Sequence, residues 1–258
     1  GLSILGSATV SAVGGANLTY AGAIVGGGAL TKAGAGTLTL SGANTHAGTT
    51  LADGTLALGS ATALGAGSLS VVAAASLANV SGADLTVANN ARLYLSGDLT
   101  YVTAAQGLNL GTGAVTVTGD RTIGTAGTLT LGGALVGVGS LTKTGAGNLV
   151  LAGTNALTGG LTVNAGTVTL GTATSAGTGA VAVNAGSLAF AAGLTAVEVS
   201  GLTTAAGTTL TLDDPTGWST GGSTLFGGNG SNFAFEDNDV FAAGIGKRNL
   251  KLDANFCE

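Results

Sequence analysis

The sequence has few of the residues with which proteins build reactive or charged surfaces. It contains no Met, a single Cys, Pro, His and Trp, and 4% aromatic residues. Charged residues make up 7% of the chain, against about 25% in an average soluble domain. Seven Lys and Arg face twelve Asp and Glu, so the basic surface of a nucleic-acid-binding protein is excluded.

Long hydrophobic runs are also missing. The longest purely apolar stretch is short and lies at 71–75, so no segment approaches the ~18 residues of a membrane-spanning helix. No charged n-region opens the sequence, and we expect no signal peptide within it. A mean hydropathy of +0.54 with 45% apolar residues excludes disorder, which requires low hydrophobicity and high net charge.

What the sequence has instead is glycine and repetition. Of its 258 residues 49 are Gly, and residues 17–48 match residues 128–159 at 18 of 32 positions. Beyond a one-residue slip the match continues, so that the two copies extend over 17–71 and 128–183. Such self-similarity is typical of stacked repeats.

Within each copy, short segments alternate apolar and small polar residues, as in Thr37–Leu40 and Thr167–Leu170. This period of two, with Gly, Asn or Asp between segments, predicts β-strands. Bulky residues to fill a β-sandwich core are scarce before residue 213, whereas the narrow interior of stacked coils is filled by Leu, Val, Ile and Ala. We therefore predict an all-β fold, a right-handed parallel β-helix (β-solenoid) of about ten coils over residues 1–212.

Composition changes near Asp213. Residues 213–258 contain seven of the twelve acids, five of the six Phe and the only Trp, Pro and Cys. We expect this segment to be a C-terminal cap, a small β subdomain or an assembly segment, because an open solenoid end has to be covered or paired.

One pattern carries a family resemblance. Leu-Thr-Lys-x-Gly-x-Gly-x-Leu-x-Leu-x-Gly-x-Asn, followed by Gly-Thr-Leu/Val-x-Leu-Gly, stands at 30–44 with 54–59 and at 141–155 with 166–171. It closely resembles the passenger-associated β-strand repeat of autotransporters. The resemblance implies a secreted protein on the bacterial cell surface, with a parallel β-helix in which the repeat serves folding and export rather than catalysis.

Few side chains offer chemistry. The only histidine, His46, would need a nucleophile and an acid to act as a base, and the nearest acid is Asp53; a position on a surface turn is the favoured interpretation. Lys32 and Lys143 recur once per copy. They could contact a partner, but we expect exposed positions at which Lys discourages sideways aggregation.

The remaining candidates are weaker. Asp237 and Asp239 could donate oxygens to calcium, although the EF-hand order is absent. Cys257 could be a free thiol, an intermolecular disulfide or incidental. Repeated Thr-x-Thr pairs, such as Thr37 with Thr39, allow an ice-binding protein but also suit any exposed strand. No catalytic or cofactor-binding residue is expected, and a polysaccharide-cleaving enzyme would need more acids than residues 1–212 contain.

The sequence therefore predicts a non-enzymatic extracellular protein with a structural or adhesive role. Its low charge and strand-rich faces favour self-association, with copies stacked head to tail into a filament or surface layer. The alternative is a passenger module that binds glycans or host surfaces.

Overall fold

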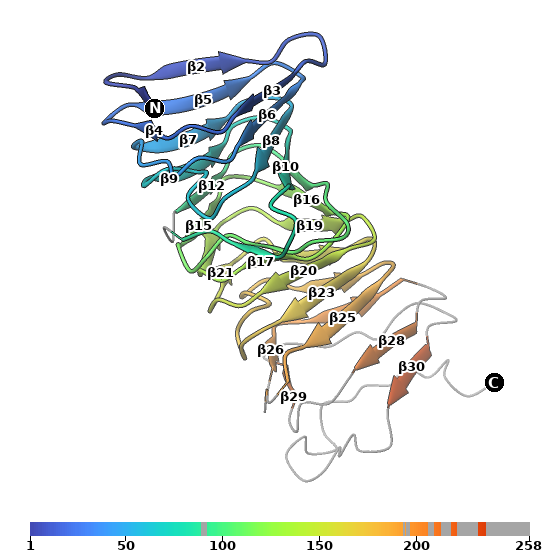
Figure 1. Cartoon of the computed structure of the whole chain (residues 1–258). Helices are drawn as coiled ribbons and strands as arrows, with labels where there is room; N and C mark the ends of the chain where they lie inside the picture. The colour runs from blue at the N-terminus through green and yellow to red at the C-terminus, as the bar shows by residue number, and fades with distance from the viewer. Residues whose placement is uncertain are drawn as a thin grey trace, which may run out of the picture.

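The chain winds into a parallel β-solenoid, as the sequence predicts (Figure 1). The computed structural model describes residues 1–88, 92–192, 194 and 197–205, together with the backbone of β28 (Thr209–Leu212), β29 (Trp218–Thr220) and β30 (Asn232–Phe235). In this part of the chain every strand pairs in parallel with its neighbours, and no helix is long and apolar enough to cross a membrane.

Three long sheets form the sides of the solenoid. The ten-stranded sheet contains, in stacking order, β3 (Asn17–Tyr20), β6 (Thr37–Leu40), β8 (Thr55–Leu58), β10 (Ala75–Asn79), β13 (Leu99–Tyr101), β16 (Arg121–Thr125), β19 (Leu141–Thr144), β22 (Leu161–Val163), β24 (Val181–Val183) and β27 (Leu202–Thr204). The eight-stranded sheet contains β2 (Ala8–Ser11), β5 (Ala29–Ala33), β7 (Gly48–Leu51), β9 (Ser68–Val71), β12 (Leu93–Leu95), β15 (Val115–Val117), β18 (Leu135–Gly137) and β21 (Ala156–Leu157).

The third side changes along the molecule. Its six-stranded sheet begins only at the fourth of these coils and contains β11 (Leu85–Thr86), β14 (Leu108–Asn109), β17 (Leu129–Leu131), β20 (Asn148–Leu151), β23 (Thr167–Leu170) and β25 (Ser187–Phe190). Three short pairs stand beside these sheets, and the first two are β1 (Leu2–Ser3) with β4 (Ile24–Val25) and β26 (Val197–Val199) with β29. Strand β30 pairs with β28, so parallel pairing continues beyond residue 212. The assignment of 213–258 as a cap or assembly segment stays a prediction, because most of it lies outside the described residues.

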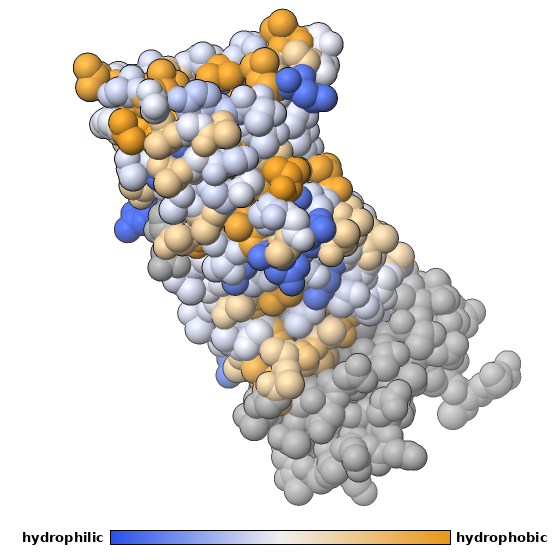
Figure 2. Space-filling model, in the orientation of Figure 1, coloured by the Kyte–Doolittle hydropathy of each residue, from blue (hydrophilic) through white to orange (hydrophobic). Residues whose placement is uncertain are grey.

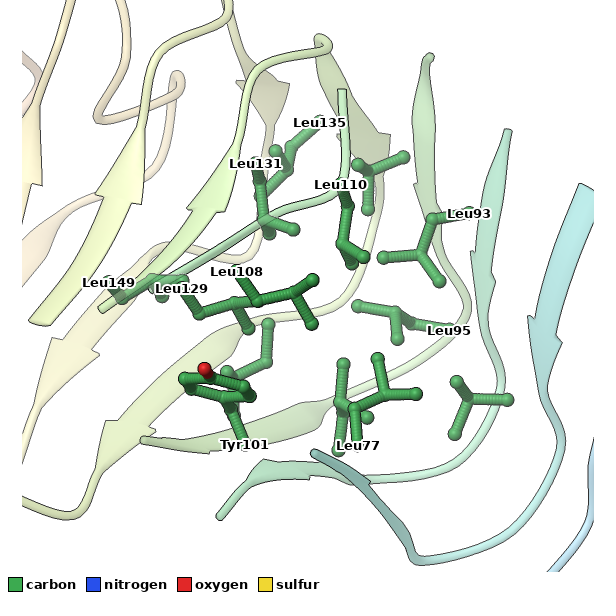
Figure 3. Packing of buried hydrophobic residues seen from close by; sticks show 14 of the residues in the cluster. Leu77, Leu93, Leu95, Tyr101, Leu108, Leu110, Leu129, Leu131, Leu135 and Leu149 are labelled. Atoms are coloured by element: carbon green, nitrogen blue, oxygen red, sulfur yellow. The ribbon is translucent and has the colours of Figure 1, made fainter. Parts of the chain in front are cut away.

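The register shows how the alternating sequence builds the core. Leu38 pairs with Leu56, 18 residues later, and Leu77 pairs with Tyr101, 24 residues later, so each coil takes roughly the length expected. Alternate side chains point inward and stack on equivalent residues of the next coil. Figure 3 shows this packing, with Leu108, Leu129 and Leu149 from three successive coils lying in one column.

Glycine at the corners permits this close stacking. A Cβ atom on Gly67 would lie 1.4 Å from the carbonyl oxygen of Ala47 in the preceding coil, so a larger residue cannot occupy that corner without a backbone shift. Gly54 and Gly166, at the same place in the two repeat copies, have φ values of 66° and 67° in the left-handed region that favours glycine.

The two repeat copies do not face the same way. In the first copy, β5 and β6 lie in the eight- and ten-stranded sheets, whereas their counterparts β19 and β20 lie in the ten- and six-stranded sheets. The offset between the copies therefore amounts to five coils plus one side of the solenoid. The outward pair Thr37 and Thr39 and its counterpart Asn148 and Val150 belong to different sides, so the repeat does not build one regular threonine face.

Candidate functional site: the corners of the repeat

The first feature of the site is a buried ammonium group at one corner of each copy. Lys32 lies at an inward position of β5, between Val10 and Leu51 of the adjacent coils, and its side chain is fully buried. Its Nζ donates hydrogen bonds to the carbonyl oxygens of Ala33 (3.0 Å), Gly34 (2.6 Å) and Asp53 (3.0 Å). The first two carbonyls belong to the corner after β5, and the third to the same corner one coil later.

Lys143 repeats this geometry on another side of the solenoid. It is fully buried between Ile123 and Val163, and its Nζ donates to the carbonyl oxygens of Thr144 (2.7 Å), Gly145 (2.7 Å) and Ala165 (3.1 Å). An ammonium group has three protons to donate, so each of them has a partner. We call these two arrangements, Lys32 or Lys143 with its three carbonyls, the lysine clamps.

The expectation that both lysines are exposed is therefore wrong, and so is that of a contact with an external partner. Within each strand Leu30 and Lys32, like Leu141 and Lys143, share the inward side, and the flexible stem carries the charge to the corner. The polar backbone of the glycine turns compensates for the loss of water around the ammonium group.

Burial nevertheless disfavours the charged form of both lysines. Desolvation lowers the pKa of Lys32, an effect that the charge of Asp53 partly opposes. Desolvation lowers the pKa of Lys143 to about 8. The second clamp lacks a neighbouring carboxylate because Ala165 stands where the first copy has Asp53.

The second feature is a buried asparagine that joins three coils. Asn44 Oδ1 accepts the backbone N–H of Ile24 at 2.8 Å in the preceding coil, and its Nδ2 donates to the carbonyl oxygen of Ala63 at 2.9 Å in the following coil. Asn155 makes the same two bonds, with Leu135 N–H at 2.8 Å and Ser175 O at 2.6 Å. In the sequence this asparagine looks like an ordinary turn residue. Its recurrence in both copies is the one sequence feature that indicates its role in joining the coils.

The third feature distinguishes the copies. His46, expected on a surface turn, is fully buried, and Leu157 stands in its place in the second copy. His46 Nε2 lies 2.9 Å from Thr49 Oγ1, which donates to the carbonyl oxygen of Leu64 at 2.9 Å. The surface prediction is wrong because residues 59–67 of the next coil cover the ring, with Gly65 lying directly against it.

These contacts leave no catalytic arrangement around His46. The hydroxyl beside it is itself buried, and Asp53 uses Oδ1 to accept the backbone N–H of Gly54 at 2.7 Å. Among the described residues no group of three His, Cys, Asp or Glu side chains could hold a metal ion. The calcium candidates Asp237 and Asp239, like Cys257, lie outside the described residues.

A comparison with protein families identifies the same two segments that contain the lysine clamps. The family model of the passenger-associated transport repeat matches residues 30–58 and 141–170. The chain carries two passenger-associated transport repeats. Comparison with curated proteins and with solved structures gave no match.

Each passenger repeat includes one complete lysine clamp and one coil-joining asparagine. The matched residues begin two positions before the clamp lysine, contain the coil-joining asparagine and end in the strand after the second glycine corner. One passenger repeat therefore corresponds to rather more than one coil, with polar groups that tie it to the coils on both sides. The repeat fits a secreted or surface-exposed protein.

Proposed function

We propose that this protein is a non-catalytic structural or adhesive component of a cell surface, and that its solenoids associate end to end. The observation that supports this most is the state of the first coil. Leu18 and Leu38 occupy the same inward column, yet Leu18 is 38% exposed and Leu38 only 3%. Leu18 is thus a side chain of core type that the described residues leave uncovered on one side.

The same end exposes further apolar side chains and free strand edges. Leu5 and Val13 are 88% and 68% exposed, and Figure 2 shows hydrophobic residues at the end of the molecule where β2 lies. Strands β2 and β3 are the terminal strands of their sheets, each hydrogen-bonded on one edge only. An unpaired edge beside an apolar column is a template for one more parallel coil.

A coil from a second copy fits this template. Such a coil supplies parallel strands with inward Leu, Val and Ala at the spacing of the columns it meets. Residues 1–28 contain no charged side chain, so the side chains of this end add no charge repulsion to the approach of another copy. Head-to-tail contacts of this kind do not close on themselves and produce filaments.

A second candidate function rests on the six-stranded sheet. Its outward residues make polar rows along the solenoid: Thr167 and Ser187 hydroxyls are 2.9 Å apart, and Thr169 Oγ1 donates to Asn148 Oδ1 at 3.1 Å. Asn184 Nδ2 donates to Asn164 Oδ1 at 2.9 Å at a neighbouring corner. Rows of hydroxyl and amide groups suit glycan binding, and a glycan array without binding would count against this candidate.

End-to-end association is tested by charging the open coil. We expect the unaltered protein to form elongated particles longer than one solenoid in negative-stain images at micromolar concentration. Leu18→Lys places a charge in the exposed inward column and should leave only single solenoids. Val102→Lys is the matched control, because Val102 is 45% exposed at a corner in the middle of the solenoid.

Two results would count against association through this end. One is an unaltered protein that stays monomeric in sedimentation velocity at ~100 μM, well above the micromolar range of weak specific contacts. The other is a Leu18→Lys variant that assembles as readily as Val102→Lys.

A further inference from the structure

Only the first passenger repeat has an ionisable group in the stretch between β6 and β7; the equivalent stretch of the second repeat, between β20 and β22, has none. His46 and Thr49 occupy places that Leu157 and Leu161 fill in the second passenger repeat, and all four side chains are buried. The second repeat shows that the fold accepts an apolar pair here. The polar pair of the first repeat is therefore a property of this one coil.

The hydrogen bonds define the protonation state of the imidazole ring in the folded protein. The Thr49 hydroxyl donates its hydrogen bond to the carbonyl oxygen of Leu64, so its oxygen accepts a hydrogen bond from the N–H at His46 Nε2. The neutral ring then has a bare lone pair on Nδ1, and this atom makes no hydrogen bond within the described residues. The carbonyl oxygen of Ile24 accepts the backbone N–H of Thr45 at 2.8 Å, and its second lone pair supports the charged ring only in part.

No charged group stands near to compensate a protonated ring. The segments packed against His46 are residues 21–28 with β4, residues 41–52 with β7, and residues 59–67, and His46 is their only titratable side chain. Asp53, the first acid along the chain, turns its carboxylate to Gly54 and its carbonyl oxygen to Lys32.

We propose that His46 makes this corner an acid-sensitive point of the solenoid, at which the coil containing the loop between β6 and β7 opens locally when the ring takes up a proton. Opening lets water reach the imidazolium ion and breaks the bonds to the next coil. Among these is the bond from Ala66 N–H to the carbonyl oxygen of His46, 2.8 Å long. The corresponding corner of the second passenger repeat, with Leu157, does not respond.

The direction of the effect follows from proton linkage. Burial lowers the pKa of His46 from its ordinary value of 6.5, and the Ile24 carbonyl opposes only part of this effect. Below pH ~6.5 the open coil binds more protons than the closed coil, so acidification favours opening. Above that pH both forms are neutral at His46, and the closed coil has its full stability.

Amide hydrogen exchange of the unaltered chain tests the proposal with an internal control. Ala66 N–H bonds to His46 O, and at the equivalent place in the second repeat Thr178 N–H bonds to Leu157 O at 3.0 Å. After correction for intrinsic exchange rates, we expect the opening of Ala66 to increase several-fold between pH 7.5 and 5, with a ceiling of about thirtyfold that the ordinary pKa of 6.5 sets at pH 5. Thr178 should change less than about twofold.

A variant then assigns the effect to the imidazole. His46→Leu copies the second repeat and leaves the Thr49–Leu64 bond intact, so the pH response of Ala66 should fall to that of Thr178. An equal response of Ala66 and Thr178 in the unaltered chain would overturn the proposal, and this comparison holds even if the variant does not fold. A response that persists in His46→Leu would overturn it equally.

Discussion

We expect the replacement of Lys143 by Ala to lower the free energy of unfolding of the second passenger repeat by about 4 kcal/mol. Two costs add up to this value. Removal of a long buried stem leaves a cavity between Ile123 and Val163, at about 2 kcal/mol or more. The carbonyl oxygens of Thr144, Gly145 and Ala165 lose their common donor, at about 1 kcal/mol or more for each that water does not reach.

Two further variants separate these costs. Lys143→Met retains most of the stem without the ammonium group, and we expect it to recover about half of the loss, since Met fills irregular core space well. Arg92→Ala removes an exposed positive charge and should change stability by less than about 0.5 kcal/mol. Urea unfolding, followed by the exchange of amides in β19 and β20, measures the stability of this region in all three variants. A local probe is needed because stacked coils can unfold separately. A Lys143→Ala variant as stable as Arg92→Ala would contradict the clamp.

The second large effect is expected at a glycine corner. Gly67→Ala should cost more than about 4 kcal/mol or prevent its coil from stacking on the first passenger repeat, because the new Cβ would overlap the carbonyl oxygen of Ala47 at 1.4 Å. No flexible side chain can move aside, since the clash is with backbone of the preceding coil. The two coils would have to separate, which breaks the stacking of the columns beside them.

Gly27→Ala is the control for this variant. Gly27 is exposed, has no atom within 4 Å of the added Cβ and is not among the glycines with a left-handed φ, so we expect a change within about 1 kcal/mol of zero. Thermal unfolding monitored by circular dichroism would show the difference. Similar midpoints for the two variants would mean that the coils are not packed as closely as described.

The fold followed from sequence because one simple rule operates along the chain. Alternation of inward and outward residues, as at Leu38 and Leu40, defines strands, and glycine marks the corners between them. The same rule also indicates the position of Lys32, two residues after the inward Leu30. The expectation of exposure gave the charge of lysine more weight than its place in the alternation, and the alternation was the better guide.

Other properties of the site depend on which coil lies above and below. His46 is buried because residues 59–67 happen to cover it, and no local pattern around His46 contains that information. The bonds of Asn44 reach residues about 20 positions away in both directions. The two copies lie on different sides of the solenoid because the offset between them, five coils plus one side, is not a whole number of turns. Only the pairing of the strands reveals this.

Amine labelling of the native protein shows whether the recurring lysine of the passenger repeat is an internal clamp or a surface residue. At pH ~8 the lowered pKa leaves a substantial fraction of Lys143 in the neutral, nucleophilic form, so only burial can protect it. We predict that mass spectrometry detects no label on Lys32 or Lys143 in the folded protein and full labelling of both after denaturation. Labelling of either lysine in the folded protein at the rate of the denatured chain would contradict its burial in the clamp.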